Sequence, residues 1–190
     1  MSGARMSARD AALLGAVGSL ERLAEAAGDR LEILGSDPSD TEWDLLARVR
    51  TVVGESPGDL RVIDEVPIRV IITEAFLEGP GKPLVIVPTE VFNPNVFKSN
   101  GAVCKEITDR GSQTLGAFVA SCIRTLTTEE VDMNDLANSS ANDLGALREL
   151  LGTPDSFPDP LEPWQARKES VRILGDYVEA GEECSGVRIL

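Results

Sequence analysis

The spacing of apolar residues changes twice along this chain, and this change constrains the fold more than any other feature. Leu13, Val17 and Leu20 follow one another at helical spacing near the start. From residue 30 to residue 87 the apolar residues form short runs separated by Gly, Pro, Ser and Asp, a pattern typical of strands. Helical spacing returns after residue 114. This order predicts an α+β fold: an N-terminal helix, a four-stranded antiparallel meander, a long loop, and two to three C-terminal helices.

Local signals place the ends of the first elements. Ser7 followed by Asp10 forms a capping pattern, so the first helix should begin there, and Gly28 is a suitable stop. The strand-like runs are expected at 31–34, 43–53 and 60–73, before a further one ahead of residue 88. Pro67 lies inside the third run and predicts an edge position or a bulge, because proline donates no hydrogen bond to a sheet.

Residues 88–112 form an unusually long connection, and functional residues are expected in it. The next segment, 115–126, has the spacing of an amphipathic helix with Cys122 on its core face. A second, shorter helix is expected at 143–151 and a last helix at about 162–179, separated by a proline-rich linker. These elements predict a single domain over residues 7–180 and a flexible tail over 181–190.

Composition excludes several classes of function. The 190 residues include 32 acidic and 18 basic side chains, a net charge of −14 that would repel nucleic acid and anionic membranes. The chain contains no histidine, which excludes Ser-His-Asp and Cys-His catalysis and histidine-based zinc sites. Three widely spaced cysteines, Cys104, Cys122 and Cys184, fit neither a disulfide framework nor a metal site. We expect no metal or organic cofactor, and a cytoplasmic location because no signal peptide is evident.

Two motifs in the long connection resemble the ubiquitin-conjugating enzyme family. Residues 83–95 read PLVIVPTEVFNPN, similar to the family's P-x-V-x-F-x-T-x-I-Y-H-P-N stretch. Residues 99–104 read SNGAVC, similar to its S-N-G-x-I-C ending. The order of helix, meander, loop and helices agrees with this family over roughly residues 8–180. The chain most resembles divergent bacterial members, and one departure is Asn93 in place of the family's histidine.

The resemblance implies roles for individual residues. Cys104 would be the nucleophile that carries the acyl group as a thioester. Asn95 matches the asparagine to which the family assigns either stabilisation of the oxyanion or a structural role in the active-site loop. Asp132 is the preferred carboxylate for helping the incoming amine, with Asn134 or Asp135 as alternatives. Contacts to the substrate are expected from Asn100, Gly101 and Asp135.

The predicted function is therefore a conjugating enzyme for a ubiquitin-like modifier. Its partners would be the modifier, an activating enzyme that spends the ATP, and a target protein with a lysine. Nucleic acid and membrane are not expected as partners. One alternative is a non-catalytic binding module of the same fold, and another is a redox or sensor protein that uses the Cys104 thiol.

Overall fold

The computed structural model describes residues 6–79, 81–106, 114–134, 136–153 and 156–158. All of them belong to one compact unit, Met1–Asp159, which is followed by a second unit, Pro160–Leu190. The predicted helix at 162–179, the domain end at residue 180 and the tail lie outside the described residues. None of the described helices combines the length and the apolar character that crossing a membrane requires.

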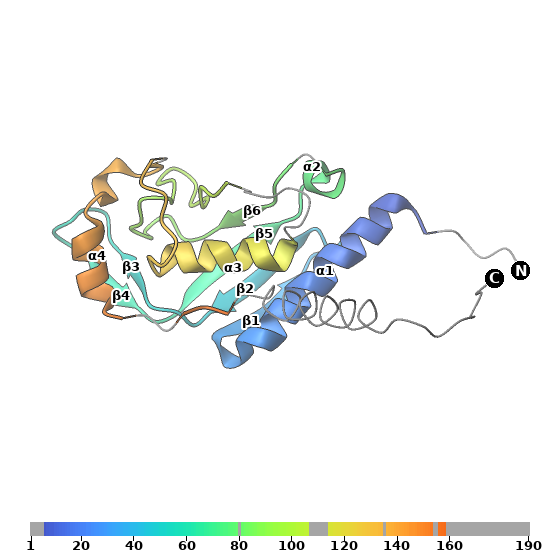
Figure 1. Cartoon of the computed structure of the whole chain (residues 1–190), viewed down its shortest axis with the longest axis horizontal. Coiled ribbons are helices and arrows are strands. Elements are labelled where there is room, and N and C mark those ends of the chain that lie inside the picture. Colours follow the sequence, from blue (N-terminus) through green and yellow to red (C-terminus); the bar gives the residue numbers. More distant parts are fainter. Residues whose placement is uncertain (1–5, 80, 107–113, 135, 154–155, 159–190) are drawn as a thin grey trace, which may run out of the picture. The chain divides into compact units, whose positions relative to one another are not determined.

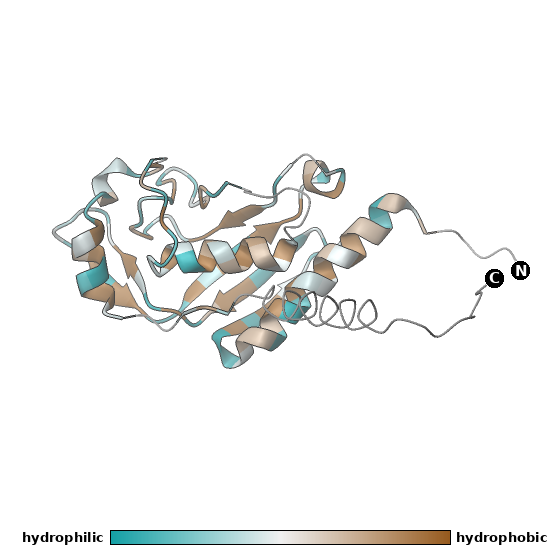
Figure 2. Cartoon of the chain, in the orientation of Figure 1, coloured by the Kyte–Doolittle hydropathy of each residue, from teal (hydrophilic) through white to brown (hydrophobic). Residues whose placement is uncertain are grey.

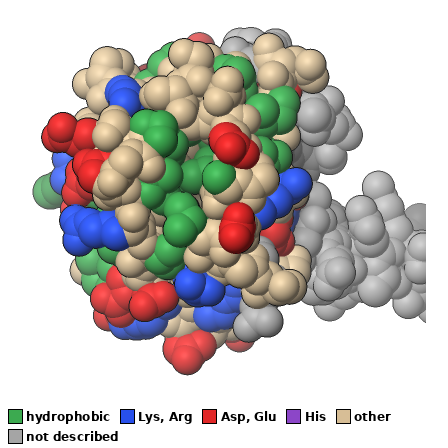
Figure 3. Space-filling view, turned by 90° about the vertical axis from the view of Figure 1, so that its left-hand side faces the viewer, with side chains coloured by type: hydrophobic (Ala, Val, Ile, Leu, Met, Phe, Trp, Pro, Cys, Tyr) green, Lys and Arg blue, Asp and Glu red, His purple; other side chains and the backbone are tan. Residues whose placement is uncertain are grey.

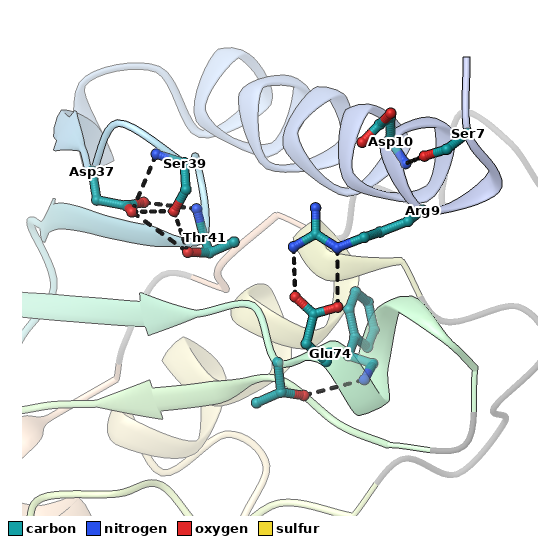
Figure 4. Close-up of polar contacts among 9 residues, drawn as sticks. Ser7, Arg9, Asp10, Asp37, Ser39, Thr41 and Glu74 are labelled. Atoms are coloured by element: carbon teal, nitrogen blue, oxygen red, sulfur yellow. Dashed lines mark hydrogen bonds and ion pairs between the residues drawn. The ribbon is translucent and has the colours of Figure 1, made fainter. Parts of the chain in front are cut away.

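The first helix begins and ends where the sequence predicts. Helix α1 spans Ala8–Ala27, and the Ser7 side chain accepts a hydrogen bond of 3.0 Å from the Asp10 backbone N–H (Figure 4). It ends at Gly28, whose φ of 60° suits a glycine. A short 3₁₀ turn, η1 (Gly28–Arg30), then leads into the sheet. Arg9 of α1 donates to both carboxylate oxygens of Glu74, which fixes the short helix α2 (Glu74–Leu77) beside α1 (Figure 4).

The main sheet is an antiparallel meander, as predicted. Its strands are β1 (Leu31–Ser36), β2 (Glu42–Ala47), β5 (Val66–Ile71) and β6 (Leu84–Ile86), in the order β1-β2-β5-β6. Pro67 pairs with Leu46 of β2, whereas β6 pairs only with the Arg69–Ile71 part of β5. Pro67 therefore lies beyond the end of the β5–β6 ladder. At this point β5 pairs with β2 but not with β6, so the missing N–H of proline is tolerated.

The sequence does not reveal a second sheet. The run at 43–53 reads as one strand, but the chain leaves the main sheet after Ala47 and forms a separate hairpin from β3 (Thr51–Val53) and β4 (Arg61–Ile63). Tertiary packing explains the break, because Val52 belongs to a smaller core next to the main one. Members of that core come from β3, the long loop, a 3₁₀ turn and the last described helix: Val52, Phe92, Ala141, Leu147 and Leu151.

Helix α3 (Leu115–Leu126) lies on the same face of the sheet as α1 (Figure 1). A single apolar face was expected, but every residue of α3 except Arg124 is buried. Figure 2 shows the hydrophobic character of α3 and of the neighbouring strands. The helices approach closely at Gly116, whose N–H donates to Ser19 Oγ at 3.0 Å. A Cβ at this position would lie 2.3 Å from the Ser19 carbonyl oxygen, so the approach requires glycine.

The last described helix, α4 (Leu144–Leu151), also agrees with its predicted range. The Asp143 side chain caps its start by accepting from the Ala146 N–H, and Gly152 ends it. A 3₁₀ turn, η2 (Ser139–Ala141), precedes it. A hollow of about 640 Å³ lies between α4, Phe92 and the turn of the β3–β4 hairpin. Hydrophobic side chains gather on this end of the molecule (Figure 3).

Candidate active site

The long loop after β6 folds back along that strand. Val87 N–H donates to Gly101 O at 2.9 Å, and Val103 N–H donates to Val85 O at 2.8 Å. Within the loop, Val96 and Val103 form an antiparallel bridge. These bonds fix the backbone immediately before Cys104, so the cysteine occupies a defined position despite lying outside regular secondary structure.

Asn100 and Gly101 make the turn that brings the loop back. The Asn100 side chain accepts from Ala102 N–H at 3.0 Å, and Gly101 has a φ of +71°. A Cβ on residue 101 would lie 1.9 Å from Val87 O, so no larger residue fits without a backbone shift. Asn100 is exposed and Gly101 is buried. Their expected contacts with a substrate remain predictions.

The two described cysteines differ sharply in environment. Cys104 is half-buried, and its N–H donates to Asn95 O at 2.6 Å. Cys122 is fully buried in α3, and burial raises the pKa of its thiol to about 12. Its prediction as a core residue is confirmed. No disulfide joins these two cysteines, and Cys184 lies outside the described residues.

Asn95 connects the Cys104 loop to the segment that follows α3. Its side chain is almost completely buried, with 1% exposed. Nδ2 donates to Asp132 O at 2.9 Å, while Oδ1 accepts from Asp132 N–H at 3.0 Å. The carboxamide thus forms a two-bond clamp on one backbone residue. Together with the Cys104–Asn95 bond, this clamp brings Cys104, Asn95 and Asp132 into one neighbourhood.

Asn93 fixes the same loop to α3. Its Nδ2 donates to Thr125 O at 2.8 Å, and its Oδ1 accepts from Asn95 N–H at 2.9 Å. The second bond is the local turn that asparagine side chains often form. Asn93 therefore acts on the shape of the loop through its backbone partners.

The acidic candidates after α3 lie in different settings. Asp132 is exposed, and its Oδ1 accepts from Asn134 N–H at 2.8 Å. Asp135 lies outside the described residues. The carboxylate of Asp132 is accordingly at the surface, with its backbone held by Asn95.

Glu130 is the centre of a cluster that the sequence does not reveal. Its carboxylate accepts from Lys105 Nζ at 2.9 Å, from Ser121 Oγ at 2.5 Å and from Arg124 Nε. Burial alone would raise the pKa of this carboxyl, but the hydrogen bonds from the three donors outweigh it and lower the pKa to about 2. Glu130 thus carries a fixed negative charge at the side chain of Lys105, the residue that follows Cys104. The sequence shows a lysine, Lys105, directly after Cys104. It does not show that this lysine pairs with a glutamate 25 residues later.

Comparison with known proteins gives matches among solved structures only. No protein-family model and no curated protein matches this chain. The chain is similar to a structure titled as a novel ubiquitin-conjugating enzyme, with 15% identity, a TM-score of 0.46, and coverage of 73% of this chain and 90% of the other. It is also similar to a ubiquitin conjugating enzyme domain from Toxoplasma gondii, with 14% identity, a TM-score of 0.39, and coverage of 73% and 97%. Both are similarities in backbone path at low sequence identity.

Proposed function

We propose that this chain accepts the acyl end of a ubiquitin-like modifier as a thioester on Cys104 and transfers it to a lysine amine of a target protein. The observation that supports this most directly is the clustering of three residues chosen from the family resemblance. Cys104 bonds the backbone of Asn95, and Asn95 clamps the backbone of Asp132.

The first step is exchange of one thioester for another. The Cys104 sulfur attacks the carbonyl carbon of a thioester offered by an activating enzyme, a carbon–sulfur bond to Cys104 forms, and the bond to the donor sulfur breaks. The donor carries an activated acyl group, so the reaction needs no histidine. The buried thiol of Cys122 is unsuited to this step because its pKa of about 12 keeps it protonated at neutral pH.

The second step is attack by a neutral amine on the Cys104 thioester. A carbon–nitrogen bond forms, the Cys104 thiol leaves, and the amine loses a proton. We assign assistance in that proton loss to the exposed carboxylate of Asp132. Asn100, Gly101 and Asp135 are proposed to contact the modifier or the target.

For Asn95 we propose a positioning role. Its carboxamide already bonds both backbone groups of Asp132, which favours the structural one of the two roles implied by the family resemblance. The clamp would keep the helper carboxylate beside the loop that carries the thioester. Loss of the clamp would then affect loading and transfer together.

The decisive test is a charging assay. Incubation with a ubiquitin-like modifier, its activating enzyme and ATP should give an adduct on a non-reducing gel that thiol reagents remove. Cys104→Ala should abolish the adduct, while Cys122→Ala should retain it. An adduct that persists in Cys104→Ala would eliminate this mechanism. A non-catalytic binding module would form no adduct at all, and a redox protein would form one without ATP or the activating enzyme.

A further inference from the structure

A lysine follows the proposed nucleophile directly in the sequence. The Cα atoms of neighbouring residues are about 3.8 Å apart, and a lysine amine stands on a flexible four-carbon chain. An amine at such a short distance from a thioester would have a large proximity advantage over the amine of a second protein. A chain that must pass its acyl group to another protein therefore needs to keep the Lys105 amine from attacking the thioester on Cys104.

The structure holds this amine in an ion pair. Lys105 Nζ lies 2.9 Å from Glu130 Oε2, and only 19% of the lysine side chain is exposed. An ammonium that donates to a carboxylate has no lone pair to offer to a carbonyl carbon. The contact therefore fixes the position of the amine at Glu130.

Glu130 is itself held firmly. Its carboxylate also bonds Ser121 and Arg124, and its backbone carbonyl accepts from Thr125 Oγ1 at 2.7 Å. Three of these contacts come from α3, which is buried along almost its whole length. The carboxylate is thus a rigid anchor for the Lys105 amine.

The other described lysines are bound differently. Lys82 Nζ donates to the Lys105 carbonyl at 3.2 Å, and Lys98 Nζ donates to the Glu55 carbonyl at 2.7 Å. Among the described lysines, Lys105 alone forms an ion pair with a carboxylate. The strongest restraint is therefore placed on the amine next to Cys104.

We propose that Glu130 prevents self-acylation by holding the Lys105 amine away from the acyl group on Cys104. This inference rests on the proposed function. In the reaction that Glu130 would suppress, the Lys105 nitrogen attacks the thioester carbon, the bond to Cys104 sulfur breaks, and the amine proton passes to solvent. The product is a stable amide on Lys105 and a regenerated thiol on Cys104.

The test uses a small acyl donor and the full chain, so it requires neither the modifier nor the activating enzyme. The thiophenyl ester of N-acetylglycine is added to the wild type and to Glu130→Gln, and thiophenol is the leaving group. Tandem mass spectrometry locates the acyl group, and hydroxylamine distinguishes the thioester, which it cleaves, from the amide. Glu130→Asp is a second variant, because it retains the negative charge but shortens the side chain by one methylene group, which should lengthen the 2.9 Å contact with Lys105.

In the wild type we expect the acyl group to remain on Cys104. In Glu130→Gln the amide on Lys105 should rise by about fivefold or more, the order expected on release of a partly exposed ion pair. The rise should disappear when Cys104→Ala is added. Glu129→Gln is the matched control, because its carboxylate accepts from the Thr127 and Ser156 hydroxyl groups, and it should behave as the wild type.

The outcomes separate the two proposals. If the donor does not acylate Cys104 in the wild type, the proposed function fails, and this inference fails with it. If Cys104 is acylated but the amide on Lys105 does not rise in either Glu130 variant, this inference alone is overturned. An amide on Lys105 that forms equally without Cys104 would also overturn it, since the acyl group would then come directly from the reagent.

Discussion

Replacement of Glu130 by glutamine should weaken the fold in a way that depends on pH. The carboxyl has an ordinary pKa of 4.5 and a folded-state pKa of about 2. At 1.36 kcal/mol for each pKa unit, this difference corresponds to at most about 3 kcal/mol of stability at neutral pH. Because 36% of the side chain is exposed, solvent screening should reduce the contribution to about 1–2 kcal/mol.

The sign of the pH dependence follows from the lowered pKa. Above pH 4.5 the carboxylate is charged in both states, and the folded state gains the full benefit of its hydrogen bonds. As the pH falls from about 4.5 to about 2, the unfolded chain takes up a proton and the folded chain does not, so the contribution is progressively lost. Below pH 2 wild type and Glu130→Gln should be equally stable, apart from differences in packing.

Urea unfolding at a series of pH values measures this directly. The free energy of unfolding should be about 1–2 kcal/mol lower for Glu130→Gln at pH 7, and the difference should shrink toward zero as the pH approaches 2. Glu129→Gln, which removes a carboxylate bonded to hydroxyl groups, should change stability by less than about 0.5 kcal/mol. A difference for Glu130→Gln that stays constant with pH, or grows in acid, would refute the reasoning.

Three further substitutions test the site. Gly101→Ala should lower the free energy of unfolding by about 2 kcal/mol or more in urea titration, because the new Cβ would meet the Val87 carbonyl at 1.9 Å and φ is positive; unchanged stability would contradict the described turn. Asn95→Ala should reduce both loading and transfer in single-turnover gels, because two backbone groups of Asp132 lose their partners; an about 100-fold loss confined to transfer would instead indicate an oxyanion role. Cys122→Ser should lower the free energy of unfolding by about 1–3 kcal/mol in thermal unfolding, because it buries a hydroxyl in an apolar core, and it should leave charging intact.

The elements that could be predicted from sequence are those whose signals are local. The Ser7 cap and the Gly28 stop define α1 within a few residues of chain, and Asp143 and Gly152 do the same for α4. Periodicity also located α3, but it did not reveal that the helix is buried on nearly all sides. That burial depends on α1, which lies about a hundred residues earlier and approaches α3 at Gly116.

The β3–β4 hairpin illustrates the opposite case. Both of its strands lie inside runs that read as continuous, since valine and isoleucine favour any pleated, half-buried setting. What separates Val52 from β2 is a second core, whose other members lie at residues 92, 141, 147 and 151. The residue pattern of one segment cannot predict packing partners that lie so far away in the sequence.

The candidate site combines both kinds of information. Its cysteine and asparagines were visible in two short motifs, but the structure holds Cys104 in place through contacts that span 25 to 37 residues. One tie joins Asn95 to Asp132, and the other joins Lys105 to Glu130. They lie on either side of the cysteine in the loop, and both end on the segment that follows α3. Because a half-buried thiol in a loop needs a rigid frame to meet an acyl donor repeatedly in one geometry, we infer that the segment following α3 serves as this frame.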